Sequence, residues 1–149
     1  MELKLADELK DDKYIKEFIN NYKIIVAKDA RYLLSYTNLQ SNTIICFDDK
    51  KDNVMVNIND VLYFESFNGD VYVKIKGKIL KVKKKLFELE EQYNKHGFIR
   101  INKSQILNIY HVNKITGSFS RKFTLYLDNN EELEVNRAYY TKFKERLEI

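Results

Sequence analysis

From residue 54 onward, apolar and polar residues alternate over short runs that are separated by polar turns. Alternation with a period of two is typical of half-buried β-strands, because successive side chains point to opposite faces of a sheet. Asn68-Gly69 is the strongest turn signal, since both central residues of a type I′ hairpin turn need a positive φ. Apolar residues at helical spacing predict two short helices, one at Leu86–Tyr93 and a last one that the Asn136 side chain caps. The pattern predicts a mainly β domain with short helices at residues 54–149.

The first 53 residues show a different pattern, in which short apolar runs alternate with helical stretches. Strands are expected at residues 3–5, 23–27 and 43–47, with the second of them buried. Asp11 or Asp12 caps a helix whose apolar side chains fall on one face: Tyr14, Ile15, Phe18, Ile19 and Tyr22. A second helix is expected after Asp29, carrying Tyr32, Leu33, Tyr36 and Leu39. A small α/β segment at residues 1–53 therefore precedes the β domain.

Composition narrows the class of protein. With 149 residues, 44% hydrophobic content, no Pro and four Gly, the chain has enough apolar residues for a core and no flexible linker. No stretch approaches the roughly 18 apolar residues of a membrane span, and acidic residues near the N-terminus argue against a signal peptide. We expect a cytoplasmic protein, in which the lone Cys46 is a buried core residue.

The net charge of +4 is unevenly distributed. Residues 1–53 hold nine basic and ten acidic residues, whereas residues 54–149 hold 17 and 12. One basic cluster contains no acid: Lys74, Lys76, Lys78, Lys81, Lys83, Lys84 and Lys85. Two interpretations stay open, namely a solvated strand face that resists pairing with other chains and a surface that faces a polyanion.

The stretch Phe98–Asn108 combines buried anchors with exposed donors. Its apolar residues are expected in the core: Phe98, Ile99, Ile101, Ile106 and Leu107. Its polar residues gather around one bend: Arg100, Asn102, Lys103 and Ser104. Asn and Lys side chains there read base edges, while a Ser hydroxyl or a free backbone N–H takes a phosphate. Gly97 lets the preceding helix stop in the left-handed conformation.

Four motifs, in order and at matching spacing, resemble the LytTR family of bacterial DNA-binding domains. They are Val61–Ser66, Leu86–Tyr93, the pattern Phe-x-Arg-Ile-x-Lys-Ser-x-Ile-Leu-Asn from Phe98, and Val135-Asn136-Arg137 with Tyr139. The resemblance implies an α+β fold of elongated antiparallel β-sheets that places loops in successive major grooves of DNA. Members often carry a receiver domain upstream, for which residues 1–53 are too short.

Carried over position by position, the resemblance implies base contacts by Lys103 and Arg137, with a weaker third contact from the Asn68–Val71 loop. The full set expected at bases is Asn102, Lys103, Arg137, Asn68 and Asp70. This chain departs from the family at Asn102, where His is common, and at Asn136, where Ser is common. Both substitutes keep hydrogen-bonding capacity, so we expect the loops to survive with altered base preference.

Phosphate contacts are expected from Arg100, Ser104, Arg121, Lys122, Lys84, Lys85 and Asn136. Arg100 alternates with apolar neighbours, so its alternatives are a phosphate contact or a salt bridge. Ser104 is expected to cap a turn at Gln105–Asn108 and to aim its backbone N–H at a phosphate. Arg137 suits guanine for an independent reason, because a guanidinium in the first turn of a helix matches O6 and N7 with two hydrogen bonds. Its alternative is a surface ion pair with Glu134.

The two alternatives to a DNA-binding protein are an enzyme and a protein-interaction module. Catalysis is not expected, because His96 and His111 lack metal-ligand spacing, no phosphate-binding glycine loop occurs, and Glu65 is the only suspect acid. We therefore expect no catalytic residue, no metal and no cofactor. The second class is a small protein-interaction module whose Lys-rich face binds an acidic partner. A DNA reader differs from it in a steep salt dependence and a strong sequence preference. RNA binding lacks an exposed aromatic platform.

The expected partner is double-stranded DNA, at tandem or direct-repeat sites about one helical turn apart, as is common in the family. Aromatic residues in the first fifty positions are more than so short a segment easily buries: Tyr14, Phe18, Tyr22, Tyr32 and Tyr36. We expect them to hold a homodimer, at least on DNA. The alternative is that they pack onto the β domain as one continuous core.

Overall fold

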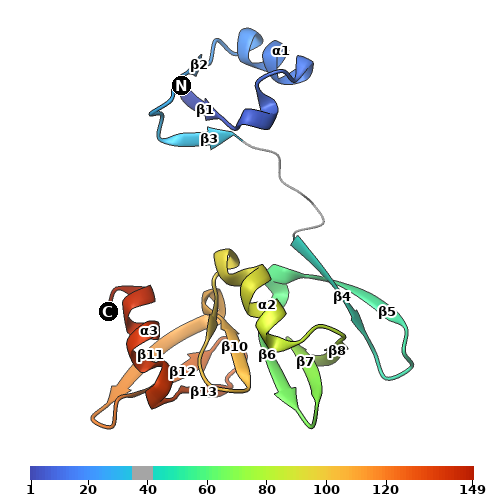
Figure 1. Ribbon diagram of the computed structural model, residues 1–149, viewed down its shortest axis with the longest axis vertical. Helices are drawn as coiled ribbons and strands as arrows, with labels where there is room; N and C mark the ends of the chain where they lie inside the picture. Colours follow the sequence, from blue (N-terminus) through green and yellow to red (C-terminus); the bar gives the residue numbers. More distant parts are fainter. Residues whose placement is uncertain (35–41) are drawn as a thin grey trace. The chain divides into compact units, whose positions relative to one another are not determined.

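The computed structural model describes residues 1–34 and 42–149, which belong to two compact units (Figure 1). The first unit is Met1–Ser41 and the second is Asn42–Ile149. This division falls before the strand Thr43–Phe47, which the sequence had assigned to the N-terminal segment. The strand is β4, and it pairs with β5 (Asn53–Asn57) in the large sheet of the second unit.

The first unit is a small parallel sheet with one helix. Its central strand β1 (Glu2–Leu5) lies between β2 (Ile25–Val26) and β3 (Tyr32–Leu34), and both pairings are parallel. A short 3₁₀ turn at Asp7–Leu9 leads to helix α1 (Lys13–Asn21). The predicted cap is confirmed, because the Asp12 carboxylate accepts hydrogen bonds from the backbone N–H groups of the first turn.

Two predictions for this unit were wrong. The predicted second helix is strand β3 at Tyr32–Leu34, since pairing with β1 outweighs the helical spacing of its apolar residues. The rest of that prediction, Tyr36 and Leu39, lies outside the described residues. Strand β2 is shorter than expected and exposed, because it forms two residues at the edge of a three-stranded sheet.

The second unit contains two antiparallel sheets and two helices, as the mainly β prediction required. The seven-stranded sheet has the order β5-β4-β8-β7-β6-β10-β9. Its other strands are β6 (Val61–Phe67), β7 (Asp70–Ile75), β8 (Lys78–Val82), β9 (Phe98–Arg100) and β10 (Gln105–Asn108). The second sheet contains β11 (Val112–Ser118), β12 (Lys122–Leu127) and β13 (Glu132–Val135). The helices are α2 (Leu86–Tyr93) and α3 (Arg137–Leu147), and 3₁₀ turns occur at Ile58–Asp60, Asn94–His96 and Ile109–His111.

Strand β6 separates two hydrophobic cores. Val61 and Phe64 pack into a core that helix α2 closes, and Leu62 and Tyr63 pack into a core with sheet β11–β13 and helix α3. A strict alternation cannot put two consecutive residues on one face. The register shift between Val61 and Tyr63 leaves Leu62 as an extra residue, which resolves this conflict. The apolar run of β6 is therefore buried on both faces.

A buried amide ties the end of β10 to the start of β6. The side chain of Asn108 is 1% exposed; its amide donates to the Val61 carbonyl at 2.9 Å and its oxygen accepts from the Tyr110 N–H at 3.2 Å. Both polar atoms of the side chain are thus satisfied inside the unit, where an unpaired group is costly.

We expect Asn108→Ala to lower the free energy of unfolding by about 1–3 kcal/mol, because it strands the Val61 carbonyl in the core. Urea unfolding followed by far-UV circular dichroism measures this. Asn113→Ala, on an exposed position of β11, is the matched control and should stay within about 0.5 kcal/mol of the parent. Equal losses in the two variants would contradict a structural role for the amide.

Candidate nucleic-acid interface

Four loops of the second unit line up along one edge. They are the turn Asn68-Gly69, the bend Ile101–Ser104, the turn Phe119–Arg121 and the start of α3 at Arg137, seen along the lower edge of this unit in Figure 1. Strand directions bring them there, because Gln105 pairs with Glu65 near the end of β6, and Phe123 pairs with Val135 at the end of β13. We call this set of loops the loop edge.

Backbone hydrogen bonds fix the spacing of three of these loops. The Ser66 N–H, at the end of β6, donates to the Ser104 carbonyl of the bend at 2.8 Å. On the other side, the Asn136 N–H donates to the Ile101 carbonyl of the bend at 3.1 Å. The bend therefore joins the β6–β7 turn to the start of α3, and the residues of three separate sequence motifs share one edge.

The β6–β7 turn confirms the hairpin prediction. Asn68 and Gly69 have φ angles of 48° and 84°, as a type I′ turn requires. The Asn68 side chain is exposed and has no hydrogen-bond partner within the described part of the chain. Asp70 differs, because its carboxylate forms an ion pair with Lys81 at 3.0 Å, and this contact raises the pKa of the lysine.

The central bend is organised by the amide of Asn102. Its oxygen accepts from the backbone N–H and the hydroxyl of Ser104, at 2.9 and 3.1 Å. Its nitrogen donates to the Gln105 side-chain oxygen at 2.7 Å, and Gln105 in turn donates to Glu65. The Ser104 N–H thus donates inside the bend, and Gln105–Asn108 is strand β10, where the sequence predicted a capped turn.

Arg100 links the backbone of the bend to helix α2. Its guanidinium donates to the backbone carbonyls of Asn102, at 2.8 Å, and Lys103, and it forms a salt bridge with Glu90 of α2 at 3.2 Å. Of the two alternatives for Arg100, the salt bridge is present. Lys103 projects into solvent, and its ammonium has no partner among the residues that the structure describes.

The start of α3 exposes a second free cation. Arg137 is the first residue of the helix, and its guanidinium has no ion pair or hydrogen bond with any described residue. Glu134, its expected alternative partner, pairs with Lys122 at 2.8 Å. Asn136 occupies the N-cap position but does not cap with its side chain, whose buried oxygen lacks a partner in the described part of the chain.

A groove of about 370 Å³ collects predicted residues from three motifs. Its lining includes Asn68 and Gly69 of the first turn, Arg100 and Lys103 of the bend, and Lys85 at the start of α2. Three cations on the walls of one open groove form an electropositive surface, which suits a phosphate backbone.

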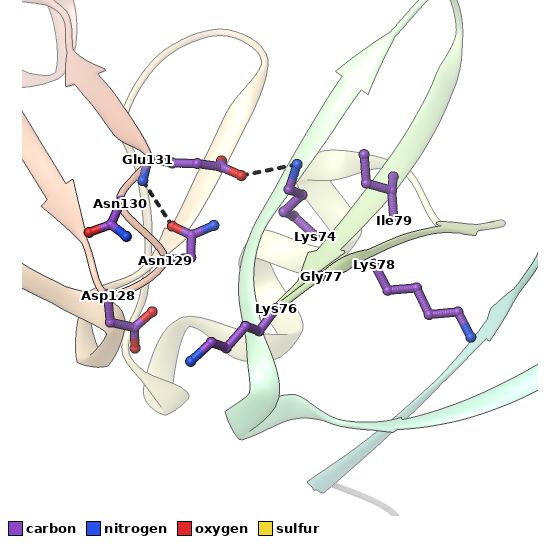
Figure 2. A pocket seen from close by; sticks show the side chains of 9 residues that line it. All are labelled: Lys74, Lys76, Gly77, Lys78, Ile79, Asp128, Asn129, Asn130 and Glu131. Carbon is purple, nitrogen blue, oxygen red and sulfur yellow. Dashed lines mark hydrogen bonds and ion pairs between the residues drawn. The ribbon is translucent and has the colours of Figure 1, made fainter.

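The lysine cluster of the sequence is divided between the two ends of the large sheet. Lys83, Lys84 and Lys85 follow β8 at the loop edge, where Val82 pairs with Val71. Lys74, Lys76 and Lys78 lie around the β7–β8 turn at the other end and line a cleft of about 500 Å³, drawn in Figure 2. Three of the seven lysines therefore lie at the loop edge and three at the other end, while Lys81 lies within β8 and pairs with Asp70.

We call this second pocket the far cleft, and Figure 2 shows Lys74 pointing toward Glu131 at its wall. Lys74 pairs with Glu131 at 3.0 Å, and the Tyr63 hydroxyl donates to the same carboxylate at 2.7 Å. Burial alone raises the pKa of Glu131, but the hydrogen bonds from Tyr63 and Lys74 outweigh it and the pKa is lowered. This partly buried link joins the two sheets of the second unit at the end opposite the loop edge.

Two residues that position the bend were not identified from the sequence. Glu90 anchors Arg100, and Gln105 fixes the Asn102 amide. Gln105 stands at a variable position of the central motif, and Glu90 lies in a helix rich in acids, so neither carried a signal.

Other chemistry is limited in the part that the structure describes. Cys46 is buried, and burial raises the pKa of its thiol to about 11. No group of three or more His, Cys, Asp or Glu residues in residues 1–34 and 42–149 is arranged to hold a metal ion. None of the helices described here is long and apolar enough to cross a membrane.

Comparison with known proteins gives consistent matches. The family model of the LytTr DNA-binding domain matches residues 51–148. An HTH-type transcriptional regulator of Staphylococcus aureus strain NCTC 8325 is 34% identical over 110 residues, which cover 74% of each chain. Its counterpart in strain MRSA252 is 33% identical over the same length. Among solved structures, the LytTr DNA-binding domain of a methyl-accepting/DNA response regulator from Bacillus cereus superposes with a TM-score of 0.68 at 26% identity, covering 72% of this chain and 98% of that one.

Proposed function

This chain belongs to the LytTR DNA-binding domain family, and we propose that it is a sequence-specific transcriptional regulator whose loop edge reads double-stranded DNA. In this proposal the loops enter successive major grooves, where every base pair displays a distinct set of donors and acceptors. The protein acts in the cytoplasm, where the DNA of a bacterium lies, and the task needs no cofactor and no catalytic residue.

The observation that carries the proposal is the pair of free cations at the loop edge. Lys103 and Arg137 are exposed, and neither has a side-chain partner among the described residues, whereas Arg100 beside them donates to two backbone carbonyls and pairs with Glu90. The bond between Asn136 and Ile101 fixes the two loops relative to each other. Free donors on fixed loops support base recognition, since readout depends on accurate placement.

The position of Arg137 gives independent support. A helix dipole disfavours a cation in the first turn, yet α3 begins with Arg137 and has no acid there. Departures from local stability rules are expected at functional sites. An anionic partner rich in bidentate acceptors, such as guanine within a duplex, fits this guanidinium.

The remaining contacts are assigned by what each side chain is free to do. Asn68 supplies the third base contact. The Asn102 amide already accepts two hydrogen bonds and donates two, the weaker donation going to the Glu134 carbonyl at 3.4 Å, so it contacts a base only by exchanging one of these bonds. Asp70 contacts a base only when its ion pair with Lys81 is broken.

The proposed phosphate contacts are Arg100, Ser104, Arg121, Lys122, Lys84, Lys85 and Asn136. Three of them already have a side-chain partner, namely Arg100, Lys84 and Lys122, and they contact a phosphate with the N–H donors that remain.

A second candidate function has support from the far cleft. Lys76 and Lys78 are exposed and lack side-chain partners within the described chain, and they lie at the opposite end from the loop edge. They suit an acidic protein partner. A module with this function alone shows no sequence preference among duplexes, which distinguishes it from a DNA reader.

We expect Lys103→Ala and Arg137→Ala each to weaken binding to the best DNA site by about 1–3 kcal/mol, and binding to random duplex much less. The reason is that both side chains contact bases. Fluorescence anisotropy titrations on the two duplexes measure the difference. Lys144→Ala, an exposed cation in the last turn of α3, is the control and should affect neither. Equal losses of binding free energy on both duplexes would show that Lys103 and Arg137 contact phosphates and not bases.

We expect the double variant Lys83→Ala with Lys85→Ala to flatten the salt dependence of DNA binding, by about one unit of log–log slope for each lost phosphate contact. These lysines lie at the loop edge. The double variant Lys76→Ala with Lys78→Ala removes the same charge at the far cleft and should leave the slope unchanged. A slope that moves equally in both would show a nonspecific charge effect.

The first unit supplies the proposed means of dimerisation. Helix α1 buries none of its residues, and its aromatic face carries Tyr14, Phe18 and Tyr22, which are 80%, 43% and 70% exposed. We propose that this face packs against a second copy on tandem sites. Two weak modules on one duplex then gain effective concentration without new base contacts.

We expect the fragment 42–149 to fold and to bind single sites with unchanged affinity, while losing cooperative binding to a tandem site. Its boundary keeps β4 in the large sheet. Circular dichroism and titrations on single and tandem duplexes provide the measurements. Cooperativity that survives in the fragment would contradict the dimer role. A fragment that fails to fold would show that the first unit completes the core.

A further inference from the structure

Phe119 is the most exposed large apolar residue of the described chain, with a relative exposure of 111%. It stands at the tip of the turn between β11 and β12, where Ser118 pairs with Lys122. The hydroxyls of Ser118 and Ser120, on either side of Phe119 in the sequence, are 2.8 Å apart and hydrogen-bonded to each other. The turn is thus held by its own polar groups, and the ring contributes nothing to the core.

The tip belongs to the loop edge. Directly after it, Phe123 pairs with Val135, and the next residue of that strand end, Asn136, donates to the central bend. In Figure 1 the β11–β12 tip lies at one end of the row of loops, beyond the start of α3. A duplex that contacts Lys103 and Arg137 therefore continues toward Phe119.

The chemistry around the ring favours DNA as its partner. Arg121, at φ 58°, is exposed and has no side-chain partner within the described residues, and two serine hydroxyls flank the tip. An apolar ring bordered by a cation and hydroxyls matches the wedges that enter between base steps while their neighbours contact phosphates. An apolar pocket on a protein partner offers no acceptor for the flanking Arg121 guanidinium and therefore fits this tip less well.

We propose that Phe119 is a further DNA-contacting residue, which stacks on a base step at the flank of the site while Arg121 contacts the adjoining phosphate. The inference rests on the proposed function and extends it. It assigns a fourth point of contact, made by stacking and not by hydrogen bonds, and it makes the β11–β12 turn responsible for deforming the duplex.

The experiment exploits the absence of tryptophan from the sequence. Phe119→Trp introduces one indole at the tip, and its fluorescence should be strongly quenched by the duplex recovered from a random library. Tyr110→Trp places an indole on a residue that is 79% exposed, in the turn Ile109–His111. This turn lies at the end of the unit opposite the loop edge, where the His111 carbonyl accepts a hydrogen bond from the Asp128 N–H. The emission of this indole should not change on the same duplex.

Phe119→Ala supplies the energetic test. It should weaken binding to the selected duplex at least about fivefold, as expected for the loss of one base–aromatic stack, and reduce DNA bending measured by energy transfer between duplex ends. Tyr110→Ala should match the parent in both. If the parent binds specifically while Phe119→Ala binds and bends equally well, the wedge is refuted and the proposed function stands. A parent that shows no sequence preference refutes the proposed function itself.

Discussion

Strand β6 is buried on both faces, and the placement of the β6–β7 turn and the central bend depends on it. One face packs under helix α2 and the other against sheet β11–β13 and helix α3. Because a shift of one residue would exchange the two faces, the register of β6 with β7 and β10 is strongly determined. That register fixes where β6 ends and β10 begins, and so fixes the β6–β7 turn and the central bend. The proposed recognition surface is thus a consequence of how the core is packed.

Within this frame, polar side chains at the loop edge fall into two groups. Arg100 and Asn102 use their hydrogen-bonding groups on the bend itself, which keeps the backbone in one shape. Lys103 and Arg137 extend from the same backbone without partners in the described chain. This division suits recognition, because ordering the loop in advance lowers the entropy cost of binding. It also explains why the bend keeps one backbone conformation although it carries many hydrogen-bond donors, since those of Arg100 and Asn102 are already bonded within it.

Features that depend on neighbouring residues were predictable from the sequence. The left-handed Gly97 and the Asn68-Gly69 turn follow from local chemistry, and the structure confirms them. The last helix was predicted at the right place, but the cap expected from the Asn136 side chain is wrong. Features that depend on distant pairing were not predictable. Tyr32–Leu34 forms a strand because β1 lies beside it. The lysines of one sequence cluster lie at opposite ends of the large sheet because β8 carries the chain roughly 17 Å between Lys78 and Lys83. Asn102 is a different case, because its bonds to Ser104 and Gln105 span only two and three residues and were missed when its side chain was assigned to a base.

The central claim is that loops on one rigid edge read bases in successive major grooves. Selection of bound duplexes from a random library, followed by guanine methylation interference on the recovered sequence, tests it most directly. Loops in successive major grooves should yield two short conserved blocks about 10 base pairs apart, with binding lost when guanine N7 is methylated in either block. A recovered pool without conserved blocks, or binding that tolerates methylation throughout both, would contradict it.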